Sequence, residues 1–195
     1  SIVSKVLEAA SFSLVLLGWL VAIISCGLPL WIVTKVSEEN SIWEGLWNIC
    51  DAEIHQNVIC MPYNSNLVMS QELQGSRVLV VICIIIISMG LLLYMIRNKL
   101  IKDESNMNNE GKIKMAASGL FVGAGLLLLV SVSWVTHNVI IDMNNSTYDP
   151  QWKPKMGASL YLGWLSSLLL LLGGALLGGA LLWCQAPLTM SSLSQ

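Results

Sequence analysis

The sequence predicts a membrane α-helical protein in which four spanning helices carry a small β-sheet outside the membrane. Three observations predict this fold class: long stretches without charge, an apolar composition, and a strand-like pattern between the first two stretches. Hydrophobic residues make up 55% of the chain and charged residues 11%, against about 25% charged residues in soluble domains. Too little polar sequence remains for a separate soluble domain, so we expect residues 1–195 to form a single domain.

Four charge-free stretches predict the membrane spans. No Asp, Glu, Lys or Arg occurs between Glu8 and Lys35, or within 78–96, 115–141 and 156–195. A helix that crosses a hydrocarbon core of about 30 Å needs about 20 residues. We therefore expect the following spans: 11–33, 78–96, 115–136 and 157–184.

The loops between these spans predict the orientation of the chain. The 97–114 loop carries five basic residues, whereas the longer segments 34–77 and 137–156 carry two each. Lys and Arg near the ends of spans favour the cytoplasmic side. We therefore expect 97–114 and both termini in the cytoplasm, and 34–77 and 137–156 outside.

The first outer segment has the pattern of short antiparallel strands. Stretches 31–36, 42–50 and 58–61 are rich in β-branched and aromatic residues, and polar, turn-forming residues separate them. A hairpin whose two arms carry Cys50 and Cys60 fits this pattern. Open sheet edges cannot lie in lipid, so we expect the sheet to stand above the membrane.

Cysteine positions agree with this orientation. Cys50 and Cys60 are the two cysteines in a predicted outer segment, on the oxidising side. A disulfide between them would remove about 2–3 kcal/mol of unfolded-state entropy. The alternative, a metal site, needs further ligands, and His55 is the one histidine nearby. Cys184, at the inner end of the fourth predicted span, is either a palmitoylation site or an unmodified thiol.

Several motifs together resemble the claudin family. The chain matches that family's signature at Trp31, at Gly45, Leu46 and Trp47, at Cys50 and Cys60, and at Arg77. This signature is shared with peripheral-myelin-type proteins and calcium-channel gamma-type subunits. Ser133-Trp134, Asp142 and the run Gly-Ala-Ser-Leu-Tyr-Leu-Gly-Trp at 157–164 are similar to later claudin segments and narrow the resemblance to claudins.

The resemblance implies a left-handed four-helix bundle with a five-stranded antiparallel extracellular sheet, four strands from the first outer segment and one from the second. It also implies a tight-junction protein of the plasma membrane that contacts lipids, assembles with other claudin-like molecules in cis and trans, and forms a paracellular barrier or pore. We expect no enzyme activity and no cofactor, because His55 and His137 lie in different outer segments without a neighbouring nucleophile or metal-ligand spacing. The net charge of −2 implies no nucleic-acid partner.

Acidic residues dominate the first outer segment. Residues 32–76 hold six acidic residues against Lys35 alone, a net charge of −5. Acidic rings favour cations in aqueous pores. Asp51 and Glu53 therefore have two interpretations: they bias a paracellular pore towards cations, or they solvate an exposed hairpin tip.

The signature residues have structural interpretations too. We expect Trp31, Leu46 and Trp47 to anchor the sheet to the bundle or the outer leaflet rather than to bind a ligand, because a Trp ring is apolar and its N–H needs a partner. Arg77 is expected to bond loop carbonyls or an acid beneath the sheet. The small-residue motifs Gly119-x3-Gly123 and Gly174-x3-Gly178 let helices approach closely, within the bundle or between copies.

The second outer segment and the C-terminus depart from the family pattern. Asp142 lacks the aromatic residues that usually follow it, although Tyr148 or Trp152 could substitute, and Asn144 and Asn145 form overlapping glycosylation sequons. The chain ends Ser-Ser-Leu-Ser-Gln instead of the scaffold-binding Tyr-Val type, so it either lacks a scaffold partner or is truncated. These departures raise an alternative function, an auxiliary or adhesion protein of the same superfamily that modulates a channel or receptor.

Overall fold

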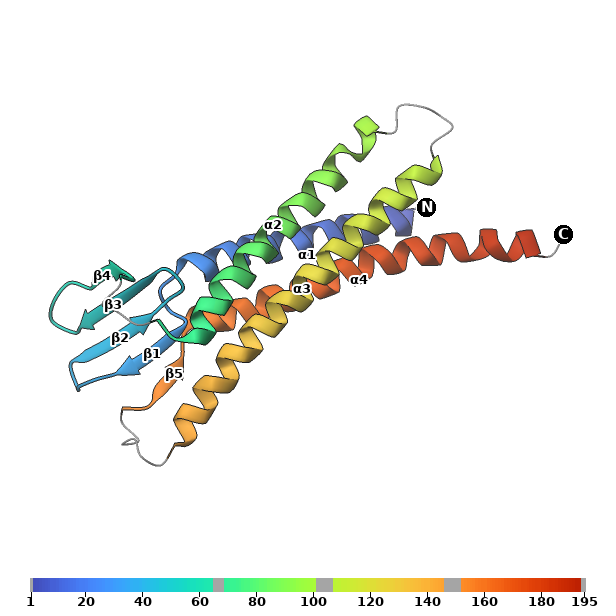
Figure 1. Cartoon of the computed structure of the whole chain (residues 1–195). Coiled ribbons are helices and arrows are strands. Elements are labelled where there is room, and N and C mark those ends of the chain that lie inside the picture. The colour runs from blue at the N-terminus through green and yellow to red at the C-terminus, as the bar shows by residue number, and fades with distance from the viewer. Residues whose placement is uncertain (1, 65–68, 101–106, 146–151, 194–195) are drawn as a thin grey trace. The chain divides into compact units, whose positions relative to one another are not determined.

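The computed structural model describes residues 2–64, 69–100, 107–145 and 152–193, and the chain forms two compact units. Unit 1 comprises residues 1–19, 83–126 and 166–195, and unit 2 comprises residues 20–82 and 127–165. Four helices contribute to both units (Figure 1): α1 (Ile2–Gly27), α2 (Gln71–Leu100), α3 (Met107–Asn144) and α4 (Ala158–Leu193). The single domain stays a prediction.

All four helices are long and apolar enough to cross a membrane, over Ile2–Gly27, Gln71–Arg97, Asn109–Asn144 and Ala158–Trp183. Their ends differ from the predicted spans. Helix α1 ends at Gly27 instead of reaching residue 33, because Pro29 disfavours the helical conformation of the residue before it. Helices α2 and α3 extend into the predicted outer segments. A charge-free stretch shows how long the apolar part of a helix is, but backbone hydrogen bonding can continue the helix into polar sequence.

Unit 2 contains a five-stranded antiparallel sheet with the strand order β4-β3-β2-β1-β5. Its strands are β1 (Ile32–Lys35), β2 (Asn40–Glu44), β3 (Asn48–Glu53), β4 (Ile59–Pro62) and β5 (Pro154–Met156). The division into four strands from the first long segment and one from the second is the one that the resemblance implied.

The stretch 42–50, which the sequence presents as one β-rich segment, is divided between β2 and β3. A tight connection at Gly45 separates the two strands, and its N–H donates a hydrogen bond to the carbonyl of Asn48 at 2.9 Å. A Cβ at Gly45 would lie 2.5 Å from Cα of Pro29. A glycine is therefore required where this connection approaches the end of α1.

A second glycine joins β5 and α4 to the chain before β1. The N–H of Gly157 donates to the carbonyl of Trp31 at 3.0 Å, and the N–H of Ser159 donates to that of Leu30 at 3.0 Å. The Ser25 hydroxyl donates to the Ser159 carbonyl at 2.6 Å. A Cβ at Gly157 would overlap the Leu30 carbonyl oxygen, at 1.9 Å. These contacts hold the short strand β5 against β1.

Helix packing in unit 1 distinguishes the two glycine motifs. A Cβ at Gly174 would lie 2.7 Å from Cγ2 of Val122, and the Ser118 hydroxyl donates to the Gly174 carbonyl at 2.7 Å. By contrast, a Cβ at Gly119 or Gly123 would meet no described atom within 4 Å. Of the two interpretations considered from the sequence, packing within the bundle therefore fits Gly174, whereas among the described residues Gly119 and Gly123 contact no neighbouring helix at Cβ.

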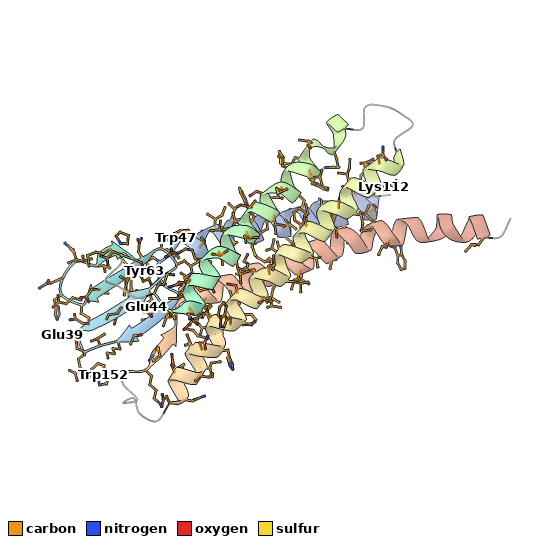
Figure 2. The ribbon with its side chains drawn as sticks, in the orientation of Figure 1. Glu39, Glu44, Trp47, Tyr63, Lys112 and Trp152 are labelled. Atoms are coloured by element: carbon orange, nitrogen blue, oxygen red, sulfur yellow. A yellow bond between two sulfur atoms is a disulfide. The ribbon has the colours of Figure 1, made fainter. Side chains whose placement is uncertain are left out.

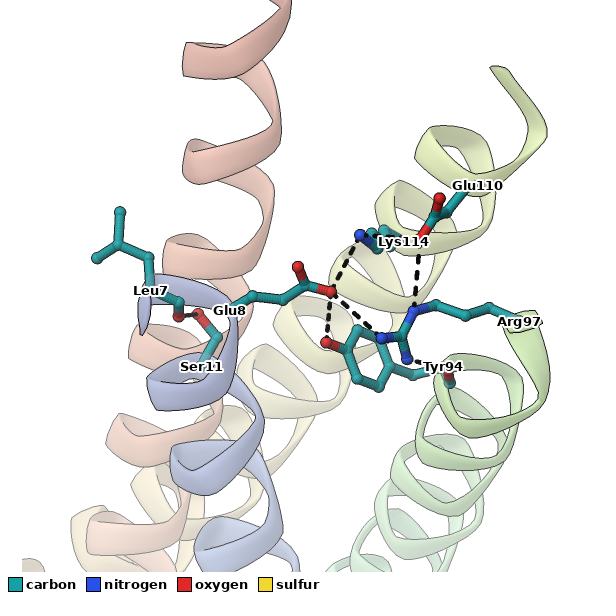
Figure 3. A network of polar contacts seen from close by, with 7 residues as sticks. All are labelled: Leu7, Glu8, Ser11, Tyr94, Arg97, Glu110 and Lys114. Carbon is teal, nitrogen blue, oxygen red and sulfur yellow. Dashed lines mark hydrogen bonds and ion pairs between the residues drawn. The ribbon is translucent and has the colours of Figure 1, made fainter. Parts of the chain in front are cut away.

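A polar network joins three helices of unit 1 (Figure 3). The Glu8 carboxylate of α1 accepts a hydrogen bond from the Tyr94 hydroxyl at 2.6 Å and lies 3.1 Å from the Lys114 ammonium and 3.6 Å from the Arg97 guanidinium. Glu110 lies 3.2 Å from Lys114 and 3.9 Å from Arg97. Among the described basic residues of 97–114, Arg97 and Lys114 are thus paired with acidic side chains.

Candidate functional site

The candidate site is one face of the sheet in unit 2. Side chains alternate between the two faces of a strand, and residues directly opposite each other on neighbouring strands share a face. Asp51 of β3 is opposite Ile42 of β2 and Ile59 of β4. We call this side of the sheet the acidic face. On the five strands it consists of Ile32, Thr34, Asn40, Ile42, Glu44, Ile49, Asp51, Glu53, Ile59, Met61, Pro154 and Met156.

The opposite face carries the disulfide and the basic residues. Cys50 and Cys60 are paired across β3 and β4 and are joined by a disulfide. Lys35 of β1 and Lys155 of β5 alternate away from the acidic face and are exposed. The sheet therefore separates its strand charges, with carboxylates on one face and ammonium groups on the other.

A groove of about 300 Å³ lies on the acidic face over β2, β3 and β4. Asp51 is exposed within it, and its walls are apolar. Ile59 and Met61 are 63% and 54% exposed, so the groove opens to the surface of the unit. The acidic-face residues that line it are Ile42, Ile49, Asp51, Ile59 and Met61, and Cys50, which alternates onto the opposite face, completes the lining.

A second pocket, of about 230 Å³, gathers three carboxylic acids, and we call it the acidic pocket. Glu44 of β2, Glu72 in the first turn of α2 and Asp142 near the end of α3 line it together with Trp152. Figure 2 labels Glu44 and Trp152 in this part of the unit. Burial, and then the nearby Glu72 carboxylate, raise the pKa of Glu44. Among the residues that the structure describes, none of these three acids forms an ion pair.

The structure places the two candidate charges differently. Asp51 lies in the groove, whereas Glu53 lies at the end of β3 opposite Asn40 and outside both pockets. Both belong to the acidic face. Within the described part of the chain, no group of three His, Cys, Asp or Glu side chains is arranged to hold a metal ion.

The signature tryptophans lie where the sheet meets the helices of unit 2. Trp31 and Leu46 are fully buried, and the Trp31 indole N–H donates to the Ser25 carbonyl at 2.9 Å. Trp47 is 42% exposed, and its indole N–H contacts Sγ of Cys26 at 3.4 Å. Trp31 and Trp47 thus each connect the sheet to the end of α1.

Arg77 occupies the junction between α2 and the sheet. Its Nε–H donates to the Leu46 carbonyl at 2.8 Å, and its guanidinium lies 5.1 Å from the centre of the Trp47 ring. Of the two partners considered from the sequence, a loop carbonyl and an acid, the structure shows the carbonyl. These contacts position the sheet, and Arg77 does not line either of the two pockets.

Tyr63 completes this junction (Figure 2), and the sequence pattern did not single it out. Burial, and then the Glu44 carboxylate, raise the pKa of the Tyr63 phenol. The phenol therefore stays protonated and donates to the Gly45 carbonyl at 2.9 Å.

Three further predicted sites lie at the edge of the described chain. Asn144 is the exposed last residue of α3 and Asn145 follows it, but the hydroxyl residues of both sequons, and Tyr148, lie outside the described residues. The side chain of Cys184 also lies outside them. Trp152, the other proposed aromatic substitute, lines the acidic pocket.

The sequence contained one signal that could have identified the acidic face. A disulfide between antiparallel arms places Cys50 opposite Cys60, so Asp51 must lie opposite Ile59 and share its face. The convergence of Glu44, Glu72 and Asp142 had no such signal, because these residues belong to three elements far apart in the sequence.

Comparison with known proteins gives one family. The PMP-22/EMP/MP20/Claudin family matches residues 5–177. Claudin-13 of Mus musculus is 44% identical over 174 residues, which cover 87% of this chain and 82% of that protein. Claudin-4 of Bos taurus is 43% identical over 176 residues, or 88% of this chain and 84% of that protein. Claudin-3 of Homo sapiens is 38% identical over 186 residues, or 93% and 82%.

Proposed function

The chain belongs to the claudin family, whose members act at tight junctions, and we propose that it assembles with other claudin-like molecules at cell–cell contacts. We further propose that its acidic face favours cations in the paracellular pathway. The observation that carries the ion preference is the exposed Asp51 on a sheet face whose other strand charges are also acidic. A carboxylate field of this kind raises the local concentration of cations and lowers that of anions.

The separation of charge between the two faces of the sheet supports this proposal. Lys35 and Lys155 alternate onto the opposite face, so they do not neutralise Asp51 at close range. A permeating ion close to the acidic face therefore experiences mainly the carboxylates.

The proposed orientation places the sheet outside the cell and both termini in the cytoplasm. The excess of Lys and Arg in 97–114 supports it. The Cys50–Cys60 disulfide supports it too, because disulfides persist on the oxidising side of the plasma membrane.

The auxiliary-subunit alternative rests on the altered second outer segment and on the C-terminal sequence. The three similar proteins named above are claudins, which supports the junction function over this alternative. A barrier without a pore is the finer alternative, and it differs from the proposal in the effect of Asp51 on ion preference.

Contact enrichment in cells that lack junctional strands tests the assembly proposal. We expect the expressed chain to concentrate at borders between two expressing cells and to be sparse at borders with a non-expressing cell. In an epithelial layer it should also change transepithelial resistance. Normal surface delivery with no enrichment and no change in resistance would contradict the proposal and favour the auxiliary-subunit function.

A further inference from the structure

The groove on the acidic face combines one carboxylate with apolar walls on both sides. Strand pairing places Asp51 directly between Ile42 and Ile59. The next row of the sheet adds Ile49 and Met61 to the same groove. Directly opposite side chains on neighbouring antiparallel strands lie about 5 Å apart at Cβ. A ligand atom that contacts the carboxylate is therefore also beside the isoleucine side chains.

This arrangement favours a particular class of ligand. A hydrated inorganic cation gains from the carboxylate but nothing from the apolar walls. A neutral apolar molecule gains from the walls but displaces water from an ionised group, which is unfavourable. An ammonium group that carries a short alkyl chain uses both parts of the groove, because its N–H groups can bond the carboxylate while its methylenes cover the isoleucines.

We propose that this groove is a binding site for amphiphilic organic cations, with Asp51 holding an alkylammonium group and Ile42, Ile49, Ile59 and Met61 packing against its alkyl chain. The groove volume of about 300 Å³ is at the lower end of the range of small-molecule sites. A small ligand is therefore expected, and n-butylammonium is a suitable probe.

Charge complementarity supports a cationic ligand over an anionic one. The segment 32–76 carries a net charge of −5. None of the six lining residues is basic, and Lys35 and Lys155 lie on the other face of the sheet. No lysine of the described strands therefore competes for Asp51 within the groove.

A methyl-labelled titration tests the proposal on the whole chain in lipid nanodiscs. The isoleucine methyl groups carry ¹³C, and n-butylammonium, methylammonium and n-butanol are added in separate series. We expect n-butylammonium to shift the signals of Ile42, Ile49 and Ile59 in a saturable manner, at least about tenfold more tightly than methylammonium, since each buried methylene adds affinity. Butanol should bind weakly, because it lacks the charge. Ile54, which is 68% exposed and outside the groove, is an internal control.

Matched variants separate the two halves of the site. Asp51→Asn should abolish saturable binding, whereas Glu39→Gln, at an exposed acid in the turn before β2, should leave it unchanged. Ile59→Ser should weaken n-butylammonium and spare methylammonium, while Ile54→Ser should change neither. Equal binding of butanol and n-butylammonium, equal binding of the two ammonium ions, or an unaltered Asp51→Asn variant would each overturn the proposal.

The titration uses isolated protein and does not depend on junction assembly. Its failure therefore leaves the contact-enrichment result untouched, and a failure of contact enrichment leaves the binding result untouched. One consequence does rest on the proposed function: n-butylammonium in the groove should lower sodium permeability across an expressing cell layer.

Discussion

At the scale of single residues, Glu44 shows how position within the sheet changes the chemistry of a side chain. It belongs to the same face as Asp51, but it lies in the pocket beside Glu72 and Asp142, whereas Asp51 is exposed in the groove. Burial, and then the Glu72 carboxylate, raise the pKa of Glu44. A carboxylate in this place costs stability when it is ionised.

Glu44→Gln should therefore stabilise the protein at neutral pH. A raised folded-state pKa means that the favourable contribution of Glu44 is complete below its unfolded-state pKa and is lost as the pH rises through the folded-state value. The melting temperature of the variant should exceed that of the wild type near pH 7.5, and the difference should vanish on acidification to about pH 4, below the ordinary glutamate pKa. The same measurement on Glu39→Gln, at an exposed turn residue, provides the control. A difference that grows on acidification would contradict this account.

At the scale of elements, the glycine motifs show the limit of interpreting a helix from its sequence. Both motifs have the same four-residue spacing, which brings two glycines to one side of a helix. The spacing does not say whether that side faces a neighbouring helix. Gly174 and Gly178 do face one, since a Cβ at Gly178 would lie 2.6 Å from Oγ of Ser118, whereas a Cβ at Gly119 or Gly123 would meet no described atom within 4 Å.

Gly174→Ala and Gly119→Ala test this difference directly. A methyl group at Gly174 would collide with Val122, so we expect a loss of about 1–3 kcal/mol in stability, typical of overpacking. At Gly119 a methyl group meets no described atom, and alanine is the better helix former, so stability should stay equal or rise slightly. Thermal unfolding in detergent, monitored by size-exclusion chromatography, gives the change in stability of both variants. Equal destabilisation by the two substitutions would contradict the packing described here.

Among the described strand pairs, the hairpin of β3 and β4 is the one that carries a covalent cross-link. Strand β4 is an edge strand, and all four of its residues are exposed. The disulfide closes a loop with a sequence separation of 10 residues. Removing it with Cys50→Ser and Cys60→Ser together should cost about 3 kcal/mol by loop entropy.

Reductant provides the check on this prediction. It should lower the melting temperature of the wild type towards that of the double variant and leave the variant unchanged. A double variant as stable as the oxidised wild type would show that the sheet does not need the cross-link.

At the scale of the whole molecule, charge-free stretches predicted the number and type of the membrane helices, because an uncharged apolar run of about 20 residues has few other uses. They did not predict the helix ends: Pro29 stops α1, and polar residues continue α3 to Asn144. The hairpin with Cys50 and Cys60 on its two arms was also accessible from the sequence. The acidic pocket was not, since it forms when β2, α2 and α3 come together in unit 2.

Cysteine labelling in cells tests the proposed orientation. Ile54→Cys, at an exposed position after β3, should react with a membrane-impermeant maleimide in intact cells. Lys112→Cys, at an exposed position in α3, should react after permeabilisation but not before. The unmodified chain measures the background from its native cysteines. Labelling of Lys112→Cys in intact cells would contradict the proposed orientation.

Dilution potentials across an expressing epithelial layer test most directly the claim that the Asp51 carboxylate makes the paracellular pathway favour cations. The wild type and Glu39→Gln should both raise sodium permeability relative to chloride, and Asp51→Asn should lose most of that preference while still concentrating at cell contacts. An Asp51→Asn layer with the sodium-to-chloride permeability ratio of the wild type, at equal contact enrichment, would contradict the claim and leave a barrier without a charge-selective pore.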